Sequence, residues 1–299
     1  MNDTTIDLDG HEIELSHTDK ILFPETGLTK WDLIDFYRRV AKTALPYYLN
    51  RPLTMQRFPD GIGQHGFFQK HTPSYFPDWI ARHQLPKEDG TVSYVVANKP
   101  ATLVYLANQA CITPHLGLAR LDQPDRPDRL IFDLDPSDRD FDKVRSVAKH
   151  IKKLLDELKL PSFVMTTGSR GLHIIVPLNR SARFDAVRGF AQALARRLSE
   201  QHPQEITVEH RKKSRGSRVF VDTLRNAYGQ TAVAPYAVRA IEGAPVATPL
   251  RWDELNDGNL DAQRYTMKNL FRRLGQIKNP WSAMDHRASD IGGACKTLF

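Results

Sequence analysis

The sequence is poor in cysteine, with only Cys111 and Cys295 among its 299 residues. Two distant cysteines can form neither a disulfide framework nor a paired-cysteine metal site, and this scarcity is typical of a reducing cytosol. Long apolar runs are also missing, and the acidic, polar start (MNDTTIDLDGHEIEL) is not the pattern of a secretory signal peptide. We therefore expect a cytoplasmic protein that does not enter a membrane.

Signals of a domain boundary are scarce in the sequence as well. The sequence shows no internal repeat, no low-complexity segment and no linker rich in glycine, proline or serine. Its length suits one large domain or two modest ones, and 40% hydrophobic residues suffice for a sizeable core. We expect a single catalytic domain over residues 1–299 with two lobes, a core of about residues 15–275, and polar tails.

Positive charge is in excess, with a net charge of +7 and a pI of about 9.3. This excess favours a polyanionic partner such as nucleic acid, but only weakly, because many basic proteins bind none. One basic stretch, EHRKKSRGSRVFVDTLR, concentrates the charge in Arg211, Lys212, Lys213, Arg215, Arg218 and Arg225. It is either a solvated loop or a loop that contacts phosphates, and the aspartate near its end, Asp222, favours the second interpretation.

Hydrophobic periodicity predicts the elements of secondary structure. Helices are expected over residues 30–49, 100–111, 141–159, 184–201 and 260–275. Strands are expected over residues 52–58, 91–97, 129–135, 162–168, 172–178, 205–210 and 217–223. The turn between the strands at 162–168 and 172–178 is too short for a parallel crossover, so at least one strand pair is antiparallel. This order indicates an α+β fold with a mixed sheet.

The stretch RLIFDLDPSD, residues 129–138, brings two carboxylates to the end of an apolar strand. Asp133 and Asp135 are two residues apart and project to the same face, whereas Leu134 faces the core. Carboxylates this close repel each other unless a cation lies between them, and hard ions such as Mg²⁺ or Mn²⁺ prefer such oxygens. The alternative is a strand end followed by an Asp-Pro turn, but Asp138 alone would serve that turn.

Two more stretches supply groups for the same chemistry. Asp222 ends the apolar strand in SRVFVDTL, so three aspartates on neighbouring strands could hold two metal ions for displacement at phosphorus. The turn in TTGSRGLHIIV lacks the spacing of a Walker A loop but is dense in donors, so we expect it to hold a triphosphate rather than to be an ordinary hairpin turn. Those donors are Thr167, Ser169, Arg170 and His173.

Three weaker signals are ambiguous. In HGFFQKH, adjacent Phe67 and Phe68 should face opposite sides of a strand, one in the core and one free to stack on a base. His115, in CITPHLGL, fits a structural histidine better than a ligand when taken alone. LPKEDG contains the K-x-D-G pattern of nucleotidyl-lysine ligases, but we interpret it as a hairpin turn.

Seven motifs taken together resemble a known family. They are TDKILFP, LTKWDLIDFY, GFFQKH, IFDLDP, TTGSRGLHIIVPL, RVFVD and TAVAPYAVRA. In this order, over about residues 15–275, they are similar to the polymerase domain of bacterial DNA ligase D, the end-joining branch of the archaeo-eukaryotic primase superfamily. The resemblance implies a primase-polymerase fold in which mixed β-sheets and flanking helices form a catalytic cleft.

The resemblance implies roles for individual residues. Asp133, Asp135 and Asp222 match metal-binding catalytic aspartates. The positions that match contacts to the incoming nucleotide are Phe67, Phe68, His115, Thr167, Ser169, Arg170, His173 and Arg239. The positions that match DNA contacts are Lys20 and Lys30 (a pocket for a 5′-phosphate), Arg215 and Arg225. Three positions depart from the familiar pattern: Thr167 replaces serine, Arg170 replaces lysine, and Arg225 replaces a shorter polar residue.

The implied activity is template-directed addition of NTPs or dNTPs to primer 3′ ends at DNA gaps and double-strand breaks, using two Mn²⁺ or Mg²⁺ ions. The implied partners are DNA ends with a recessed 5′-phosphate, a Ku-type end-binding protein and a DNA ligase, and the implied location is the bacterial nucleoid. A DxD-type phosphatase and a non-catalytic nucleic-acid-binding module are the alternatives. A phosphatase would need a downstream lysine and acidic pair, and the sequence has no convincing one. A binding module would not explain three converging aspartates.

Overall fold

The computed structural model describes residues 4–298, which form two compact units. Of the described residues, unit 1 contains 4–122, 231–247 and 266–271, and unit 2 contains 123–230, 248–265 and 272–298. The chain therefore passes between the units several times, which explains why no linker is visible in the sequence.

Unit 1 is built on a five-stranded sheet with a short extra strand. The strand order is β15-β9-β5-β8-β7, and β6 pairs with β5. Two small hairpins, β1-β2 and β3-β4, complete its strands. The bounds are β1 Thr4–Leu8, β2 His11–Leu15, β3 Ile21–Phe23, β4 Leu28–Thr29, α1 Lys30–Ala44, β5 Leu53–Arg57, β6 Phe67–Gln69, β7 Arg82–Lys87, β8 Gly90–Val95, α2 Pro100–Asn108, β9 Cys111–Gly117 and β15 Thr231–Val233.

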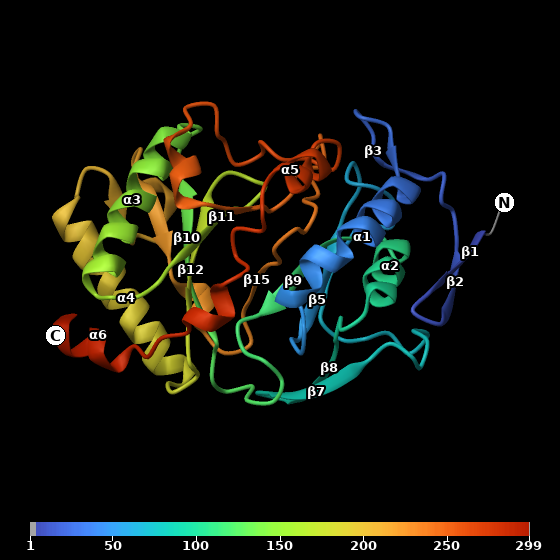
Figure 1. Cartoon of the computed structure of the whole chain (residues 1–299), viewed down its shortest axis with the longest axis horizontal. Helices are drawn as coiled ribbons and strands as arrows, with labels where there is room; N and C mark the ends of the chain where they lie inside the picture. The colour runs from blue at the N-terminus through green and yellow to red at the C-terminus, as the bar shows by residue number, and fades with distance from the viewer. Residues whose placement is uncertain (1–3, 299) are drawn as a thin grey trace. The chain divides into compact units, whose positions relative to one another are not determined.

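Helix α1 shows how local sequence starts an element of this unit. Thr29 and Asp32 form a reciprocal capping box, in which the side chain of each residue accepts a hydrogen bond from the backbone N–H of the other. The helix then buries an apolar stripe that includes Leu33, Ile34 and Val40. In Figure 1, α1 and α2 lie beside the strands β5 and β9 of unit 1. Capping and periodicity therefore both act to fix the start of α1 at Lys30.

Unit 2 is built on a six-stranded mixed sheet with the order β13-β14-β10-β12-β11-β16. The pair β13-β14 is parallel and the other neighbouring strands are antiparallel. The bounds are β10 Arg129–Pro136, α3 Phe141–Glu157, β11 Phe163–Thr166, β12 Leu172–Pro177, α4 Phe184–Gln201, β13 Ile206–Thr207, β14 Val219–Asp222, β16 Pro249–Leu250 and α6 Gly292–Leu298. The observed α+β architecture with a mixed sheet confirms the predicted fold class.

The core of unit 2 lies between this sheet and the helices α3 and α4, which Figure 1 shows side by side. Leu130, Phe132 and Leu134 of β10 are fully buried in this core. Each such side chain contributes about 1.5–3 kcal/mol on burial. Because side chains alternate along a strand, Asp133 and Asp135 emerge on the opposite face. The helices therefore cover one face of the central strand and leave its carboxylates on the other.

Most predicted elements are present with shifts of a few residues, but the helix expected over residues 260–275 is wrong for most of its length. Only α5, Leu270–Gln276, is helical. Asp261 and Asn269 accept hydrogen bonds from the backbone of Gln263 and Thr266, so this segment folds as side-chain-stabilised turns. The hairpin turn predicted at LPKEDG is confirmed, since Lys87 pairs with Gly90 across the β7-β8 connection.

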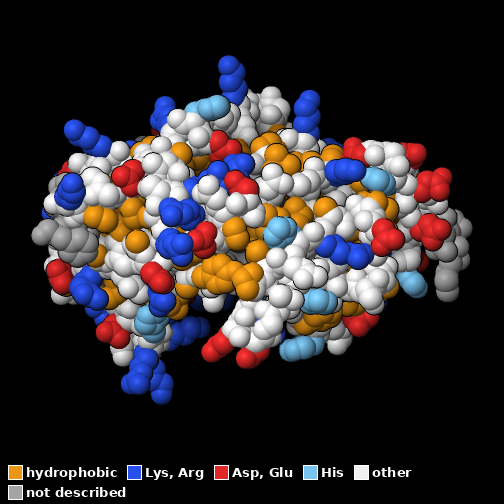
Figure 2. Space-filling view, turned by 90° about the horizontal axis from the view of Figure 1, so that it is seen from below, with side chains coloured by type: hydrophobic (Ala, Val, Ile, Leu, Met, Phe, Trp, Pro, Cys, Tyr) orange, Lys and Arg blue, Asp and Glu red, His pale blue; other side chains and the backbone are white. Residues whose placement is uncertain are grey.

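The surface reflects the mixed charge of the sequence. Figure 2 shows lysine and arginine side chains interspersed with acidic side chains and apolar patches over the visible face. Charge on this face therefore does not by itself trace a path for a polyanion. Within residues 4–298, the structure has no helix long and apolar enough to cross a lipid bilayer.

Candidate active site

The predicted aspartates meet at the strand β10. Asp133 lies directly opposite Asp222 of β14 on one side and His173 of β12 on the other. Asp135 lies one step further along the same face, opposite Phe220. The sequence prediction that Asp133, Asp135 and Asp222 belong to neighbouring strands is therefore confirmed, and cross-strand pairing places the first and third about 5 Å apart at the Cα atoms.

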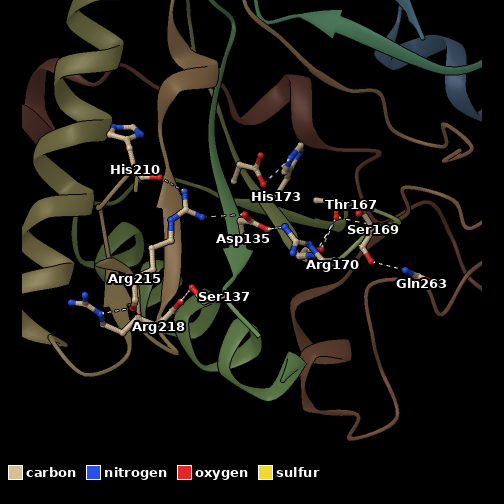
Figure 3. Close-up of polar contacts among 12 residues, drawn as sticks. Asp135, Ser137, Thr167, Ser169, Arg170, His173, His210, Arg215, Arg218 and Gln263 are labelled. Atoms are coloured by element: carbon tan, nitrogen blue, oxygen red, sulfur yellow. Dashed lines mark hydrogen bonds and ion pairs between the residues drawn. The ribbon is translucent and has the colours of Figure 1, made fainter. Parts of the chain in front are cut away.

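Cationic side chains surround the two carboxylates of β10. Arg170 Nη2 lies 2.8 Å from Asp135 Oδ1, and Arg215 Nη1 lies 3.3 Å from Asp135 Oδ2, so Asp135 is held between two arginines (Figure 3). Arg225 Nε lies 3.6 Å from Asp133 Oδ2. These cations partly balance the negative charge that two adjacent carboxylates concentrate on this face.

Arg215 has a more buried position than a loop contact to DNA suggests. Its side chain is only 8% exposed and its guanidinium stacks 3.8 Å over the Phe220 ring. Its nitrogens also donate to the backbone carbonyls of Glu209 and His210, both at 2.9 Å. These bonds close the basic loop onto β14 and Asp135, so in this arrangement Arg215 links the loop to the carboxylates.

Asp222 shows the electrostatic cost of this arrangement. Burial raises the pKa of its carboxyl, and the Asp133 charge raises it further, although a hydrogen bond from Leu224 N–H at 2.7 Å opposes the shift. A carboxylate that is both partly buried and opposite another carboxylate is stabilised by a hard divalent cation. The donor set of carboxylate oxygens therefore fits Mg²⁺ or Mn²⁺.

The turn that follows β11 approaches the catalytic strand closely. A Cβ atom on Gly171 would lie 1.7 Å from the carbonyl oxygen of Leu134, so only glycine fits there. Thr167 Oγ1 accepts hydrogen bonds from the N–H groups of Ser169 and Gly171, both at 3.3 Å. The Thr167 hydroxyl therefore fixes the shape of the turn. It also occupies two of the backbone donors that the sequence suggested for an anion.

Arg170 and His173 remain oriented toward the aspartates. The Arg170 side chain is 53% exposed and extends from the turn to Asp135. The His173 ring is 4% exposed, with Nε2 3.5 Å from Asp133 Oδ1, whereas its Nδ1 has no hydrogen-bond partner among the residues described. A buried polar atom without a partner is costly, so Nδ1 of this ring would gain from a hydrogen-bond partner. A hollow of about 470 Å³ on the other side of Arg170 is lined by Ser169, Arg170 and Asp138 and does not include the three aspartates of the strands or His173.

In unit 1, the two lysines expected at a 5′-phosphate lie near each other. Lys30 is nearly buried, with Nζ 3.1 Å from the carbonyl oxygen of Asn108 and 3.3 Å from Ser16 Oγ. Burial and, to a lesser extent, the positive charge of Lys20 together lower the pKa of Lys30 to about 8. Lys20 itself pairs with Asp60 at 2.6 Å. Two cations whose charges repel form a site that an anion would stabilise.

The aromatic pair of β6 corrects one prediction. Phe67 and Phe68 are 43% and 62% exposed, so neither belongs to the core. β6 is a three-residue strand that pairs with β5, and both of its phenylalanines remain open to solvent. Phe68 packs edge-to-face against His115 of β9 at 5.3 Å between ring centroids. Arg239, the last nucleotide-contact candidate, lies in unit 1 and its N–H donates to the carbonyl of Pro245 at 2.7 Å.

Two residues that support the candidate site were not predicted from the sequence. Asn226 is fully buried and bonds both the N–H and the carbonyl of Ile131, which continues the hydrogen bonding of β10 beyond β14. Gln263 Nε2 donates to the carbonyl of Ser169 at 2.9 Å and supports the turn. These three bonds join residues 94 or 95 positions apart, and no local spacing signals such contacts. By contrast, Asp138 accepts a bond from Asp140 N–H in the turn that the sequence assigned to it.

A family model described as "LigD, primase-polymerase domain" matches residues 29–281. Among curated proteins, the chain is 32% identical over 256 residues to the multifunctional non-homologous end joining protein LigD of Mycolicibacterium smegmatis, covering 85% of this chain and 34% of that protein. It is 31% identical over 265 residues to the bifunctional non-homologous end joining protein LigD of Bacillus subtilis, covering 88% of this chain and 42% of that protein. The chain thus spans about a third to two fifths of the length of these relatives.

The fold also matches a solved structure. The polymerase domain from Mycobacterium tuberculosis ligase D, in complex with DNA, has 31% sequence identity and a TM-score of 0.87. The match covers 93% of this chain and 99% of that one. The likeness therefore extends over both compact units.

Proposed function

Because the chain belongs to the LigD primase-polymerase domain family, we propose that it extends primer 3′ ends on a DNA template at gaps and broken ends. Membership makes it a nucleotidyltransferase of the primase-polymerase class with a role in end joining. Its substrates are proposed to be NTPs or dNTPs. The residue assignments and the metal are part of the same proposal.

The observation that carries this proposal is the row formed by Asp222, Asp133 and His173 across three neighbouring strands, with Asp135 beside it. This row combines carboxylates for divalent ions with a buried imidazole and a nearby arginine for phosphate oxygens. A phosphatase would need one carboxylate as a nucleophile, whereas nucleotidyl transfer needs carboxylates that only bind ions. Like-charged carboxylates directly opposite each other suit the binding of metal ions better than they suit nucleophilic attack by one of them.

In the proposed reaction the primer 3′-oxygen forms a bond to the α-phosphorus, and the bond between that phosphorus and the pyrophosphate oxygen breaks. Asp133, Asp135 and Asp222 would hold two divalent ions, Mn²⁺ or Mg²⁺. When bound, these ions would lower the pKa of the 3′-hydroxyl and neutralise the charge of the leaving pyrophosphate. The residues of the chain would position the triphosphate and hold its charge.

Arg170 and His173 are proposed to bind the triphosphate. Arg170 is exposed and is paired with Asp135 through one of its guanidinium nitrogens, so it can turn to a phosphate without leaving a buried charge behind. As an imidazolium, which donates from both ring nitrogens, His173 would bond Asp133 through Nε2 and a phosphate oxygen through Nδ1. The turn containing Thr167 and Ser169 would keep both groups in place, because the Thr167 hydroxyl fixes its shape.

The residues of unit 1 are proposed to bind the other parts of the substrate. Lys20 and Lys30 would bind the 5′-phosphate at the far side of a gap, and the exposed rings of Phe67 and Phe68 would stack on bases. His115 and Arg239 are proposed to contact the incoming nucleotide, and Arg225 the DNA. A Ku-type end-binding protein and a DNA ligase, acting at the chromosome, are the proposed partners.

Primer extension with Mn²⁺ on a gapped duplex bearing a 5′-phosphate tests the proposal. The unaltered protein should add nucleotides templated by the gap, and Asp133→Asn should lower the rate by at least about 100-fold. Asp78→Asn, at an exposed position of unit 1, should keep the full rate and controls for the loss of one charge.

Two outcomes would contradict different parts of the proposal. If the unaltered protein adds no nucleotide to any gapped duplex, the polymerase activity is refuted. If extension occurs but Asp133→Asn retains it, the site is refuted while the activity stands. Release of phosphate from p-nitrophenyl phosphate that depends on Asp133 would favour the phosphatase alternative.

A further inference from the structure

A second group of metal-ligating side chains lies away from the aspartates. His150, His202 and Glu205 each offer one ligand atom, and these atoms all lie within 4.8 Å of one another. Among the described residues, no other three histidine, cysteine or acidic side chains, the aspartates of β10 and β14 included, bring their ligand atoms this close together. The helices α3 and α4 cover the face of the sheet opposite to Asp133 and Asp135, and His150 lies on α3. The two groups therefore lie on opposite sides of the sheet.

Three different segments of unit 2 bring the group together. His150 lies in the middle of α3, His202 is the C-terminal capping residue of α4, and Glu205 immediately precedes β13. The backbone fixes the last two in a tight turn, because the carbonyl of His202 accepts from the N–H groups of Glu205 and Ile206 at 3.1 and 2.9 Å. Glu205 is also tied to the sheet through its carbonyl, which accepts from Val219 N–H at 2.8 Å.

One distance in this group is close to the spacing of two ligands on a bound transition metal, whereas the two imidazoles are not yet arranged for it. The rings of His150 and His202 stack nearly face to face, with centroids 3.7 Å apart and planes 26° apart, so they must turn before both can direct a nitrogen at one ion. Nε2 of His150 lies 3.6 Å from Glu205 Oε1. Two ligands about 2.0–2.1 Å from a tetrahedral zinc ion are about 3.4 Å apart, so this pair is already near the required spacing. Rotation of the two half-buried imidazoles out of their stack would complete the set.

A supporting contact orients the carboxylate. Ser146, one turn before His150 on α3, donates its hydroxyl to Glu205 Oε2 at 2.8 Å. This bond engages one carboxylate oxygen and leaves Oε1 directed toward His150, as outer hydrogen bonds do around known metal ligands. The C-terminal end of the 18-residue helix α4, where His202 lies, also carries the partial negative charge that favours a cation.

We propose that His150, His202 and Glu205 hold a divalent transition-metal ion such as Zn²⁺, with water as the fourth ligand. Two imidazoles and one carboxylate select zinc-like ions over Mg²⁺ and Mn²⁺, which prefer all-oxygen sites. The ion ties α3 to the α4–β13 connection, behind the strand that carries Asp133. Its contribution is to the stability of unit 2 and not to nucleotidyl transfer.

The test uses the full chain, stripped with EDTA and titrated with Zn²⁺ by calorimetry and with Co²⁺ by visible absorption. The unaltered protein should bind Zn²⁺ at this site and give a cobalt spectrum typical of imidazole ligands. His202→Gln should weaken this binding at least about tenfold, and Ser146→Ala should weaken it less but measurably. His286→Gln, at an exposed position of the same unit, should bind like the unaltered protein.

A second readout is thermal unfolding, because a ligand that binds the folded state raises the melting temperature. Saturating Zn²⁺ should raise it by roughly 5 °C in the unaltered protein and in Asp222→Asn, but not in His202→Gln. If His202→Gln does not fold, Glu205→Gln removes one ligand oxygen with little change in shape and should give the same losses. The proposal is wrong if the unaltered protein, His286→Gln and the His202 or Glu205 variant all bind Zn²⁺ with the same affinity and show the same thermal shift.

Discussion

Asp133 and Asp222 lie directly opposite each other on the antiparallel strands β10 and β14. Like charges in this relationship destabilise a strand pair by about 0.2–1 kcal/mol. Burial and the Asp133 charge accordingly raise the pKa of Asp222. The folded state thus holds a proton at Asp222 more tightly than the unfolded chain, and without metal it loses stability as the pH rises through the titration of this carboxyl.

We therefore expect Asp222→Asn to stabilise the metal-free protein at neutral pH by up to about 1 kcal/mol while abolishing metal-dependent extension. The gain should shrink as the pH falls and Asp222 becomes protonated. Thermal or denaturant unfolding in EDTA between pH 4 and pH 8 measures it. Asp78→Asn should show no such pH-dependent gain, and a destabilised Asp222→Asn protein at neutral pH would argue against repulsion at this pair.

Arg215 offers a test of whether a basic-loop residue acts through structure. Its guanidinium bonds two backbone carbonyls, contacts Asp135 and stacks on Phe220, which lysine cannot reproduce. Arg215→Lys should lower the free energy of unfolding by about 1.5–3 kcal/mol, the range for hydrogen bonds to charged groups. The exposed Arg211 of the same loop is the control, since Arg211→Lys should be neutral. Equal stability of both variants would leave Arg215 as a surface contact only.

Local sequence pattern predicted much of this arrangement. The alternation in RLIFDLD was enough to place Leu134 in the core and Asp133 and Asp135 on the other face, because strand geometry determines side-chain direction. Amphipathic spacing likewise predicted α3 and α4. These features depend on neighbours a few residues away, and such neighbours are visible in sequence.

Features that depend on distant partners were not predictable in the same way. Phe67 and Phe68 are both exposed because of how β6 pairs with β5, and two adjacent phenylalanines in a sequence do not reveal that pairing. The segment at 260–269 has apolar residues near helical spacing, yet Asp261 and Asn269 side chains capture its backbone donors instead. His150 and Glu205 are far apart in sequence and meet only through the packing of α3 against the sheet.

Lys30 should make the response to a 5′-phosphate depend on pH near neutrality. Its pKa is about 8, below its usual value of 10.5, first because of burial and then because of Lys20. Lys30 is therefore charged below about pH 8 and progressively neutral above it. The preference of the protein for 5′-phosphorylated over 5′-hydroxyl gapped DNA should fall as the pH rises through this range, as measured by fluorescence anisotropy without metal.

Lys20 provides a second test of the same pH dependence. Lys20→Gln removes the repulsion that lowers the pKa of Lys30, so the midpoint of the remaining pH dependence should move to higher pH. Lys42→Gln, on the exposed face of α1, should leave the midpoint unchanged. A phosphate preference that stays constant from pH 7 to pH 9.5 would exclude Lys30 from the contact.

Gly171 gives the sharpest test of the link between the phosphate turn and the catalytic strand. A Cβ atom there would lie 1.7 Å from the carbonyl oxygen of Leu134, between the two aspartates of β10, so Gly171→Ala must push the turn or the strand aside. We expect a loss of about 1–3 kcal/mol or more in the free energy of unfolding, together with a loss of extension. Gly189→Ala, in the interior of α4 with nothing within 4 Å of the new Cβ, should instead stabilise by about 0.5–1 kcal/mol. Denaturant unfolding of both variants measures the contrast, and a Gly171→Ala protein as stable and active as the unaltered one would show that the turn does not press against β10.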